Sequence, residues 1–219
     1  YRQWCSTTTD ILGCQLYEST RSRISGGMRR ANAGFPKECD MILEYRGVRP
    51  RIGDNVFIAP TAVVIGDVEI RDNASIWYGT VVRGDRDTIT IGEKTNIQDN
   101  CTVHTDPGKP VSIGSGVSVG HGAVVHGCTI ENDCLIGIKA AVLNGAVIRQ
   151  GSIVGSGAVV REGQEVGPFQ LVAGVPAEPK KRLDETVVEK IRDTTRTYLT
   201  LAAEHAHNLV TNGCPSAVS

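Results

Sequence analysis

Residues 52–82 read IGDNVFIAPTAVVIGDVEIRDNASIWYGTVV, and an aliphatic side chain returns in them at every sixth position. The spacing continues along the chain after two short interruptions and, later, the loss of one residue. The aliphatic positions are Ile52, Ile58, Val64, Ile70, Ile76, Val82, Ile91, Ile97, Val103, Ile113, Val119, Val125, Ile130, Ile136, Val142, Ile148, Val154 and Val160. A period of six matches neither the helical period of 3.6 nor the simple alternation of a strand. It predicts short strands joined by tight corners, the repeat of a parallel β-helix.

The corners of this repeat carry small side chains, with Gly, Asn or Asp just before them. Examples of the small residues are Ala62, Ala74, Thr95, Ala123, Ala140 and Ala158. The pattern resembles the left-handed β-helix family, in which three hexapeptides make one triangular coil, and the handedness we expect rests on that resemblance. The predicted fold is therefore all-β, a left-handed parallel β-helix of about six coils. An antiparallel sandwich is the alternative, but it would place turns every 8–12 residues rather than keep a strict six.

The repeat also sets the expected boundaries. The β-helix should cover residues 48–178, and residues 179–210 should form a helix that Asp184 caps and that packs along the solenoid. Residues 1–47 should be an N-terminal extension, partly helical, and residues 211–219 a tail. Residues 1–30 are basic and rich in Ser and Thr, which is typical of a mitochondrial targeting segment. A mildly basic surface segment is the alternative.

Composition excludes several classes of function. A net charge of -1 gives no reason to expect a nucleic-acid partner. Apolar runs are far too short for a transmembrane segment. The seven cysteines are an odd number without a CxxC pair, so we expect free thiols in a reducing compartment.

Counting the repeats by threes assigns each to one face of a triangular prism. The repeats at Val82, Val103 and Val125 fall on the same face, the third, so the outward residues that follow them form one column: Arg83, His104 and His126. Adjacent coils lie about 4.8 Å apart. Two stacked imidazoles can share one Zn²⁺, whose bonds to nitrogen are about 2.0–2.1 Å long. Histidines that merely face solvent are the alternative.

A catalytic zinc needs a third protein ligand and an open position. His121 is the candidate, but its register places it on the second face. We therefore expect His121 of one chain to complete the pair on a neighbouring chain, which three-fold symmetry would repeat at three identical sites. Gln98 and Asp99 should lie on the His121 side of the site, and Arg83 with Asp85 on the other side.

At these residues the sequence resembles the γ-class carbonic anhydrase family. The matching stretches are Ser75-Ile76-Trp77-Tyr78-Gly79, Arg83-Gly84-Asp85, Asn96-Ile97-Gln98-Asp99-Asn100, Val103-His104, Gly120-His121, Val125-His126-Gly127-Cys128 and Gly174-Val175-Pro176-Ala177. The resemblance implies zinc-dependent hydration of CO2 to bicarbonate, with His104, His121 and His126 as ligands and Fe²⁺ or Co²⁺ as alternative metals. It implies that Gln98 lies beside the reacting water, and that Arg83, Asp85 and Asp99 shape the pocket and the subunit contact.

Two departures bear on turnover. Arg86 stands where the founding archaeal member has an acidic residue, and the loop 105–110 lacks that member's acidic proton-shuttle loop. The terminal segments resemble the γ-carbonic anhydrase subunits of mitochondrial complex I. That resemblance implies a homotrimer or heterotrimer on the matrix face of the inner membrane, in contact with membrane-arm subunits. Two alternatives remain: a scaffold subunit of complex I with little or no turnover, and a hexapeptide-repeat acyltransferase.

Overall fold

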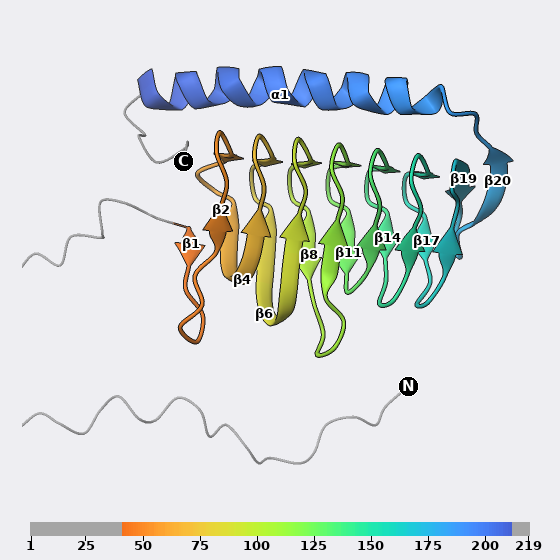
Figure 1. Cartoon of the computed structure of the whole chain (residues 1–219), viewed down its shortest axis with the longest axis horizontal. Coiled ribbons are helices and arrows are strands. Elements are labelled where there is room, and N and C mark those ends of the chain that lie inside the picture. Colours follow the sequence, from red (N-terminus) through yellow and green to blue (C-terminus); the bar gives the residue numbers. More distant parts are fainter. Residues whose placement is uncertain (1–40, 212–219) are drawn as a thin grey trace, which may run out of the picture. The chain divides into compact units, whose positions relative to one another are not determined.

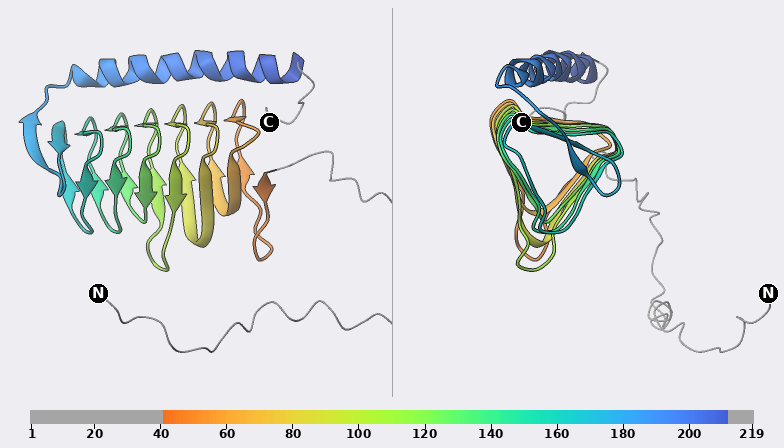
Figure 2. Two further views of the ribbon diagram at one scale, coloured as in Figure 1. Left: turned by 180° about the vertical axis from the view of Figure 1, so that it is seen from behind. Right: turned by 90° about the vertical axis from the view of Figure 1, so that its right-hand side faces the viewer.

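The computed structural model describes residues 41–211, all of which belong to one compact unit. These residues form a parallel β-solenoid with a triangular cross-section and one C-terminal helix (Figures 1 and 2). The predicted β-helix is thereby confirmed. The predicted N-terminal helical segment and nearly all of the predicted tail lie outside the described residues.

Seven strand segments stack in parallel on each face of the prism within residues 41–211, and two long strands turn a corner and serve two faces. The third face is built from β1 (Ile42–Leu43), the first halves of β4 (Val63–Ile70) and β6 (Val81–Ile91), β8 (Thr102–His104), β11 (Val124–His126), β14 (Ala141–Val142) and β17 (Val159–Val160). The first face is built from β2 (Arg51–Ile52), the second halves of β4 and β6, β9 (Val111–Ile113), β12 (Thr129–Ile130), β15 (Val147–Ile148) and β18 (Glu165–Val166). The second face is built from β3 (Phe57–Ile58), β5 (Ser75–Ile76), β7 (Asn96–Ile97), β10 (Ser118–Val119), β13 (Leu135–Ile136), β16 (Ile153–Val154) and β19 (Gln170–Ala173).

The core is a stack of the aliphatic residues that define the repeat. Val64, Val82, Val103, Val125 and Val142 lie in neighbouring coils of the third face and are fully buried. Burying each such side chain contributes about 1.5–3 kcal/mol. The small residues at the corners are buried as well, because a larger side chain would collide with the coil above or below it.

The corners explain why Gly, Asn and Asp precede the small residues. Asn73, Lys94, Asp133 and Gly122 all have positive φ and stand directly before a buried small residue. Glycine and, among the other residues, asparagine and aspartate adopt this left-handed conformation most readily. Gly, Asn and Asp precede the small residues because the backbone of the corner requires a residue that tolerates positive φ.

Four departures from the period fall at one corner, between the third and first faces. The first is the hairpin between Tyr45 and Val48, which separates β1 from β2. Extra residues enter inside β6 and between β8 and β9, where Asp106 and Lys109 pair across a tight turn. One residue is lost between β11 and β12. The longer corners project beyond the others when the prism is viewed along its axis (Figure 2).

Helix α1 (Val187–Thr211) runs along the solenoid and packs on its second face, against β3, β5 and β10 (Figure 1). The carboxylate of Asp184 accepts a hydrogen bond from the Thr186 amide at 2.9 Å just before the helix, as expected of a cap. The helix buries Val187, Ile191 and Ala202. Among the described residues, no helix combines the length and the apolar character needed to cross a membrane.

Two predicted boundaries are wrong. Residues 178–182 do not begin the helix but form strand β20 (Glu178–Arg182), which pairs antiparallel with β19. The solenoid begins before residue 48, because β1 pairs in parallel with β4. A hairpin between Tyr45 and Val48 separates β1 from β2 and hides the repeat there.

Candidate functional site

The pairing register brings His104 and His126 together on the third face, as the spacing predicts. His126 lies opposite His104 in the ladder between β11 and β8, and Arg83 lies opposite His104 in the ladder between β6 and β8. The imidazole centroids are 5.0 Å apart, and His104 Nδ1 lies 3.0 Å from His126 Nε2. Two nitrogens on one tetrahedral Zn²⁺ lie about 3.3 Å apart, given bonds of 2.0–2.1 Å. The observed spacing is therefore close to that of two ligands on one ion.

Asp85 sets the orientation of His104. Its Oδ1 lies 3.0 Å from His104 Nε2, and its Oδ2 accepts a hydrogen bond from Arg83 at 2.5 Å. Burial opposes ionisation of Asp85, but the hydrogen bonds from His104 and Arg83 outweigh it and lower the pKa of Asp85. A carboxylate can only accept hydrogen bonds, so His104 carries its proton on Nε2 and its lone pair on Nδ1.

Asn144 sets the orientation of His126. Its Oδ1 lies 2.8 Å from His126 Nδ1, and its Nδ2 donates to Asp106 Oδ2 at 3.0 Å. The hydrogen bond from Asn144 is the main reason that the pKa of Asp106 is lowered. With an oxygen facing Nδ1, His126 carries its proton there and its lone pair on Nε2.

When both imidazoles are neutral and in these tautomers, the lone pairs on His104 Nδ1 and His126 Nε2 point at each other. A shared divalent cation, or a proton on one of the two nitrogens, removes the repulsion between the lone pairs. Neutral imidazole nitrogens backed by hydrogen-bond acceptors are a common ligand arrangement for Zn²⁺. The donor set on the third face thus fits a metal such as zinc.

His121 lies apart from this pair, at the corner after β10. Its Nδ1 lies 2.8 Å from Asp99 Oδ2, and its Nε2 lies 3.4 Å from the hydroxyl of Tyr198 on α1. Asp99 fixes the lone pair of His121 on Nε2 in the same way that Asp85 acts on His104. Within residues 41–211 of one chain, no three His, Cys, Asp or Glu side chains come together in a way that could hold a metal ion. One chain therefore does not bring His104, His126 and His121 together.

Gln98 lies on the second face and is only 6% exposed. Its Nε2 donates to Asn96 Oδ1 at 3.0 Å, and Asn96 Nδ2 donates to Ser118 Oγ at 2.9 Å. These two hydrogen bonds fix the orientation of the Gln98 amide. The register places Gln98 on the face of His121, as predicted.

The sequence analysis missed Asn144, Asp106 and Tyr198. Tyr198 could have been found, since it belongs to the apolar stripe of the predicted helix. Asn144 and Asp106 carry no such signal, because one sits at an ordinary corner and the other in an insertion.

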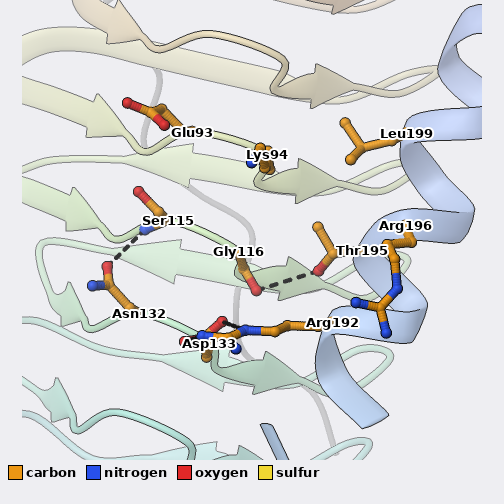
Figure 3. A pocket seen from close by; sticks show the side chains of 10 residues that line it. All are labelled: Glu93, Lys94, Ser115, Gly116, Asn132, Asp133, Arg192, Thr195, Arg196 and Leu199. Carbon is orange, nitrogen blue, oxygen red and sulfur yellow. Dashed lines mark hydrogen bonds and ion pairs between the residues drawn. The ribbon is translucent and has the colours of Figure 1, made fainter. Parts of the chain in front are cut away.

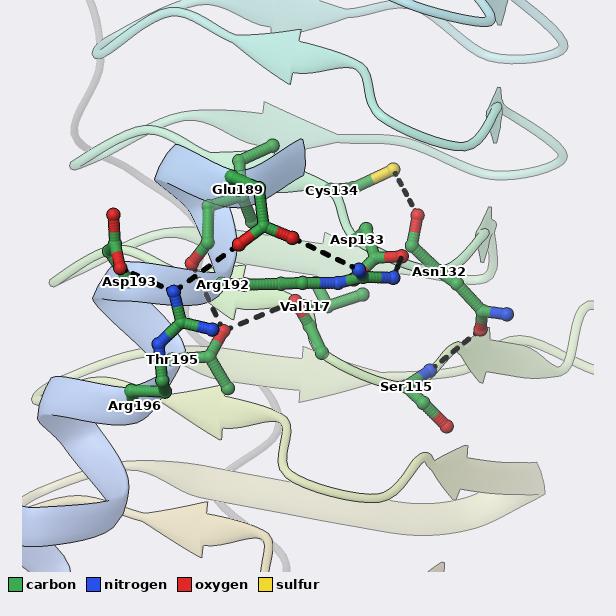
Figure 4. A network of polar contacts seen from close by, with 12 residues as sticks. Ser115, Val117, Asn132, Asp133, Cys134, Glu189, Arg192, Asp193, Thr195 and Arg196 are labelled. Carbon is green, nitrogen blue, oxygen red and sulfur yellow. Dashed lines mark hydrogen bonds and ion pairs between the residues drawn. The ribbon is translucent and has the colours of Figure 1, made fainter. Parts of the chain in front are cut away.

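Within the part of the chain that the structure describes, Cys101, Cys134 and a cavity beside the helix give no sign of an alternative site. Burial raises the pKa of Cys101 to about 11 and that of Cys134 to about 12, so neither thiol readily forms the reactive thiolate. A cavity of about 500 Å³ lies between α1 and the corners of the second face (Figure 3). Two of its charged side chains pair with each other: Arg192 makes two 3.0 Å contacts with Asp133 (Figure 4). This cavity lies at the seam where the helix docks.

The fold defines a hexapeptide-repeat protein. The family model described as bacterial transferase hexapeptide (six repeats) matches residues 49–84. A hexapeptide transferase family protein from Anaplasma phagocytophilum has a TM-score of 0.71 and 40% identity, with 74% of this chain and 96% of that chain covered. A variant of an N-acyltransferase from Bacillus cereus, with a TM-score of 0.58, 17% identity and coverage of 67% and 90%, shares the fold alone.

A protein from Methanocaldococcus jannaschii described as a probable carbonic anhydrase is 46% identical over 151 residues, which cover 69% of this chain and 95% of that protein. γ-Carbonic anhydrase 2 of Arabidopsis thaliana, a mitochondrial protein, is 56% identical over 55 residues, which cover 25% of this chain and 20% of that protein. The chain belongs to the γ-class carbonic anhydrase family, an enzyme family built on hexapeptide repeats.

Proposed function

We propose that this protein catalyses the reversible hydration of CO2 to bicarbonate, with Zn²⁺ held between two chains of a trimer. The observation that carries the proposal is the pair of facing imidazole nitrogens, His104 Nδ1 and His126 Nε2, 3.0 Å apart. Relatives described as carbonic anhydrases, one of them 46% identical, support the reaction.

The third ligand in this proposal is His121 of a neighbouring chain. The histidine pair lies on the third face and His121 on the second, so one chain cannot bring them together. A closed three-fold ring that sets the third face of each chain against the corner after β10 of the next chain would complete three equivalent sites. Identical chains or related chains can both form such a ring.

Bound by these imidazoles, zinc would supply a Lewis acid that lowers the pKa of water to about 7. The residues of the chain would do the rest. Asp85 and Asp99 hold His104 and His121 in the tautomers that present a lone pair. Gln98 is anchored through its Nε2, which leaves its oxygen to orient the reacting water. Arg83 adds positive charge beside His104 that attracts bicarbonate.

Zinc content tests the ligands. His104→Ala, His126→Ala and His121→Ala should each abolish stoichiometric zinc, whereas His207→Ala, at an exposed position on α1, should keep it. Mixing His104→Ala with His121→Ala chains should restore about one site in every mixed trimer, or about a quarter of the wild-type zinc after random 1:1 mixing. Zinc retained in a ligand variant, or mixtures that never regain zinc, would contradict the shared site.

The reaction itself is tested by stopped-flow CO2 hydration on the zinc-loaded assembly. The expected result is a rate above that of buffer, lost in His104→Ala and unchanged in His207→Ala. A fully zinc-loaded trimer without any rate above buffer would reject catalysis and favour the scaffold alternative. Acyl-CoA binding without stoichiometric metal would favour an acyltransferase instead.

We further propose that the protein works in mitochondria, at the matrix face of the inner membrane, with membrane-arm subunits of complex I. The local match to a mitochondrial γ-carbonic anhydrase of Arabidopsis thaliana supports the compartment. Native gel electrophoresis of solubilised mitochondria should show the chain migrating with complex I. A chain found only in a free trimer would contradict this partner.

A further inference from the structure

We propose that Asp106 is a positioning residue that acts through Asn144 to set the tautomer of His126. This inference rests on the proposed zinc site. His104 and His121 each have a carboxylate in direct contact, Asp85 and Asp99. For His126 the inference assigns a carboxylate, Asp106, that acts through the amide of Asn144.

The contacts form a chain of three groups. Asp106 Oδ2 accepts from Asn144 Nδ2 at 3.0 Å, and Asn144 Oδ1 lies 2.8 Å from His126 Nδ1. The remaining nitrogen, His126 Nε2, lies 3.0 Å from His104 Nδ1. Each group in this chain is therefore fixed by the one before it, starting from Asp106.

Asp106 determines which end of the Asn144 amide faces His126. An asparagine side chain can present either its oxygen or its nitrogen to a neighbour, because the two ends have nearly the same shape. A carboxylate only accepts, so Asp106 draws the NH2 group of Asn144 toward itself and turns the oxygen toward His126. Without Asp106 the amide could turn over and donate to His126 Nδ1, which would move the proton of His126 to Nε2 and take away the ligand lone pair.

The irregular corner of the solenoid is what makes this contact possible. Asp106 and Asn144 are separated by 38 residues and lie two coils apart. The turn that follows Thr105 is closed by a hydrogen bond from the Lys109 amide to the Asp106 carbonyl at 2.9 Å, with Gly108 at φ 71. This inserted turn carries Asp106 to Asn144. A corner of the regular six-residue repeat lacks the extra residues that form this turn.

The tautomer of His126 in metal-free His104→Ala protein tests the inference without any zinc, because in this variant no imidazole nitrogen faces His126 Nε2. Long-range ¹H–¹⁵N spectra should be recorded near pH 8.5, about two units above the ordinary imidazole pKa of about 6.5. His126 should be protonated on Nδ1 in this variant, and adding Asp106→Asn should give a mixture of both tautomers. A His126 protonated on Nε2 in His104→Ala, or a tautomer unchanged by Asp106→Asn, would overturn the inference.

A swap of the two groups gives an independent readout. Asp106→Asn alone leaves two amides without a fixed direction, and Asn144→Asp alone sets two carboxylates against each other. Each should weaken Zn²⁺ binding about 10–100-fold, as changes in residues that support metal ligands commonly do. The double variant Asp106→Asn/Asn144→Asp restores one acceptor facing His126 and one donor behind it, so its Zn²⁺ affinity should return to within about threefold of wild type.

The matched control is Asn132→Asp. Asn132 also sits at a corner and also points its Oδ1 at a glycine of the preceding coil, but it accepts from the Ser115 amide at 2.8 Å and lies away from the histidines. Its Zn²⁺ affinity should be unchanged. Single variants that bind Zn²⁺ as wild type does, or a double variant no better than the singles, would overturn the inference. A protein that binds no Zn²⁺ in any form would reject the proposed function, and the tautomer spectra would still decide the role of Asp106.

Discussion

Gly127 controls how closely Asn144 can approach His126. The corner at Gly127 has a φ of 53, and a Cβ atom built there would lie 2.2 Å from Asn144 Oδ1. No pair of atoms tolerates that distance, so the side chain of Asn144 occupies the place where any other residue at 127 would have its Cβ. The missing residue between β11 and β12 and the lack of a side chain at 127 together make room for the amide.

Gly127→Ala should therefore weaken Zn²⁺ binding as well as stability. The added methyl group pushes Asn144 away from His126, while the left-handed backbone adds strain of about 1–3 kcal/mol. Gly163→Ala is the control, because Gly163 has a similar φ of 66 but nothing within 4 Å of the added Cβ. Urea unfolding should show a loss of stability in both variants, and zinc titration should show weaker binding only in Gly127→Ala. Equal zinc affinities would contradict this role.

What could be predicted at this scale was the position of a residue in the repeat. His104, His126 and Arg83 could be placed in one column because each follows a counted aliphatic residue, and the strand register bears this out. The partner of His126 could not be predicted in this way. Asp106 reaches Asn144 from an inserted turn, and the path of an insertion depends on local backbone geometry rather than on a period.

Helix α1 is held to the solenoid by two kinds of contact. Near its start, Arg192 binds Asp133, whose side chain is only 9% exposed (Figure 4). Thr195 donates to the Gly116 carbonyl at 3.3 Å (Figure 3). Farther along, His205 Nδ1 lies 2.9 Å from the Tyr78 hydroxyl, within a group of packed aromatic rings. Tyr198 lies between these contacts and faces His121. The docking of the helix therefore determines the surroundings of His121.

Arg192→Ala should loosen the helix, whereas Arg196→Ala should not. Arg192 bridges to the solenoid, but Arg196 pairs with Glu189 and Asp193, which belong to the helix itself. Without Arg192, the buried carboxylate of Asp133 loses its charged partner. Hydrogen exchange of the amides in α1 should become several-fold faster in Arg192→Ala and stay unchanged in Arg196→Ala. Equal exchange in the two variants would show that the aromatic contacts alone hold the helix.

The elements could be predicted where the apolar pattern was regular. The solenoid and the helix that follows it were predicted in this way, and Asp184 was identified as the residue that caps the start of the helix. The strands β1 and β20 were not predicted, because the hairpin between Tyr45 and Val48 separates β1 from the repeat and β20 is exposed along its whole length. Neither strand fully buries a side chain, and both are held by backbone pairing, β1 with β4 and β20 with β19.

In the whole molecule His121 lies apart from the His104–His126 pair, so zinc in the proposed trimer would join chains as well as support chemistry. A ligand that binds only the assembled form stabilises it by mass action. Removing zinc with a chelator should lower the temperature of unfolding and make it depend more strongly on protein concentration. Thermal scans over a hundredfold range of concentration, with native mass spectrometry, measure both effects. Identical scans with and without zinc would show that the metal does not link the chains.

A six-residue repeat has no built-in length, since every coil exposes backbone groups on which another could be laid. Strand β20 ends the stack by pairing antiparallel with β19. Its sequence Glu-Pro-Lys-Lys-Arg presents a proline and three positive charges at the free edge, features that discourage a further strand from adding there. This terminal strand is thus a built-in stop against the growth of a finite particle into a fibre.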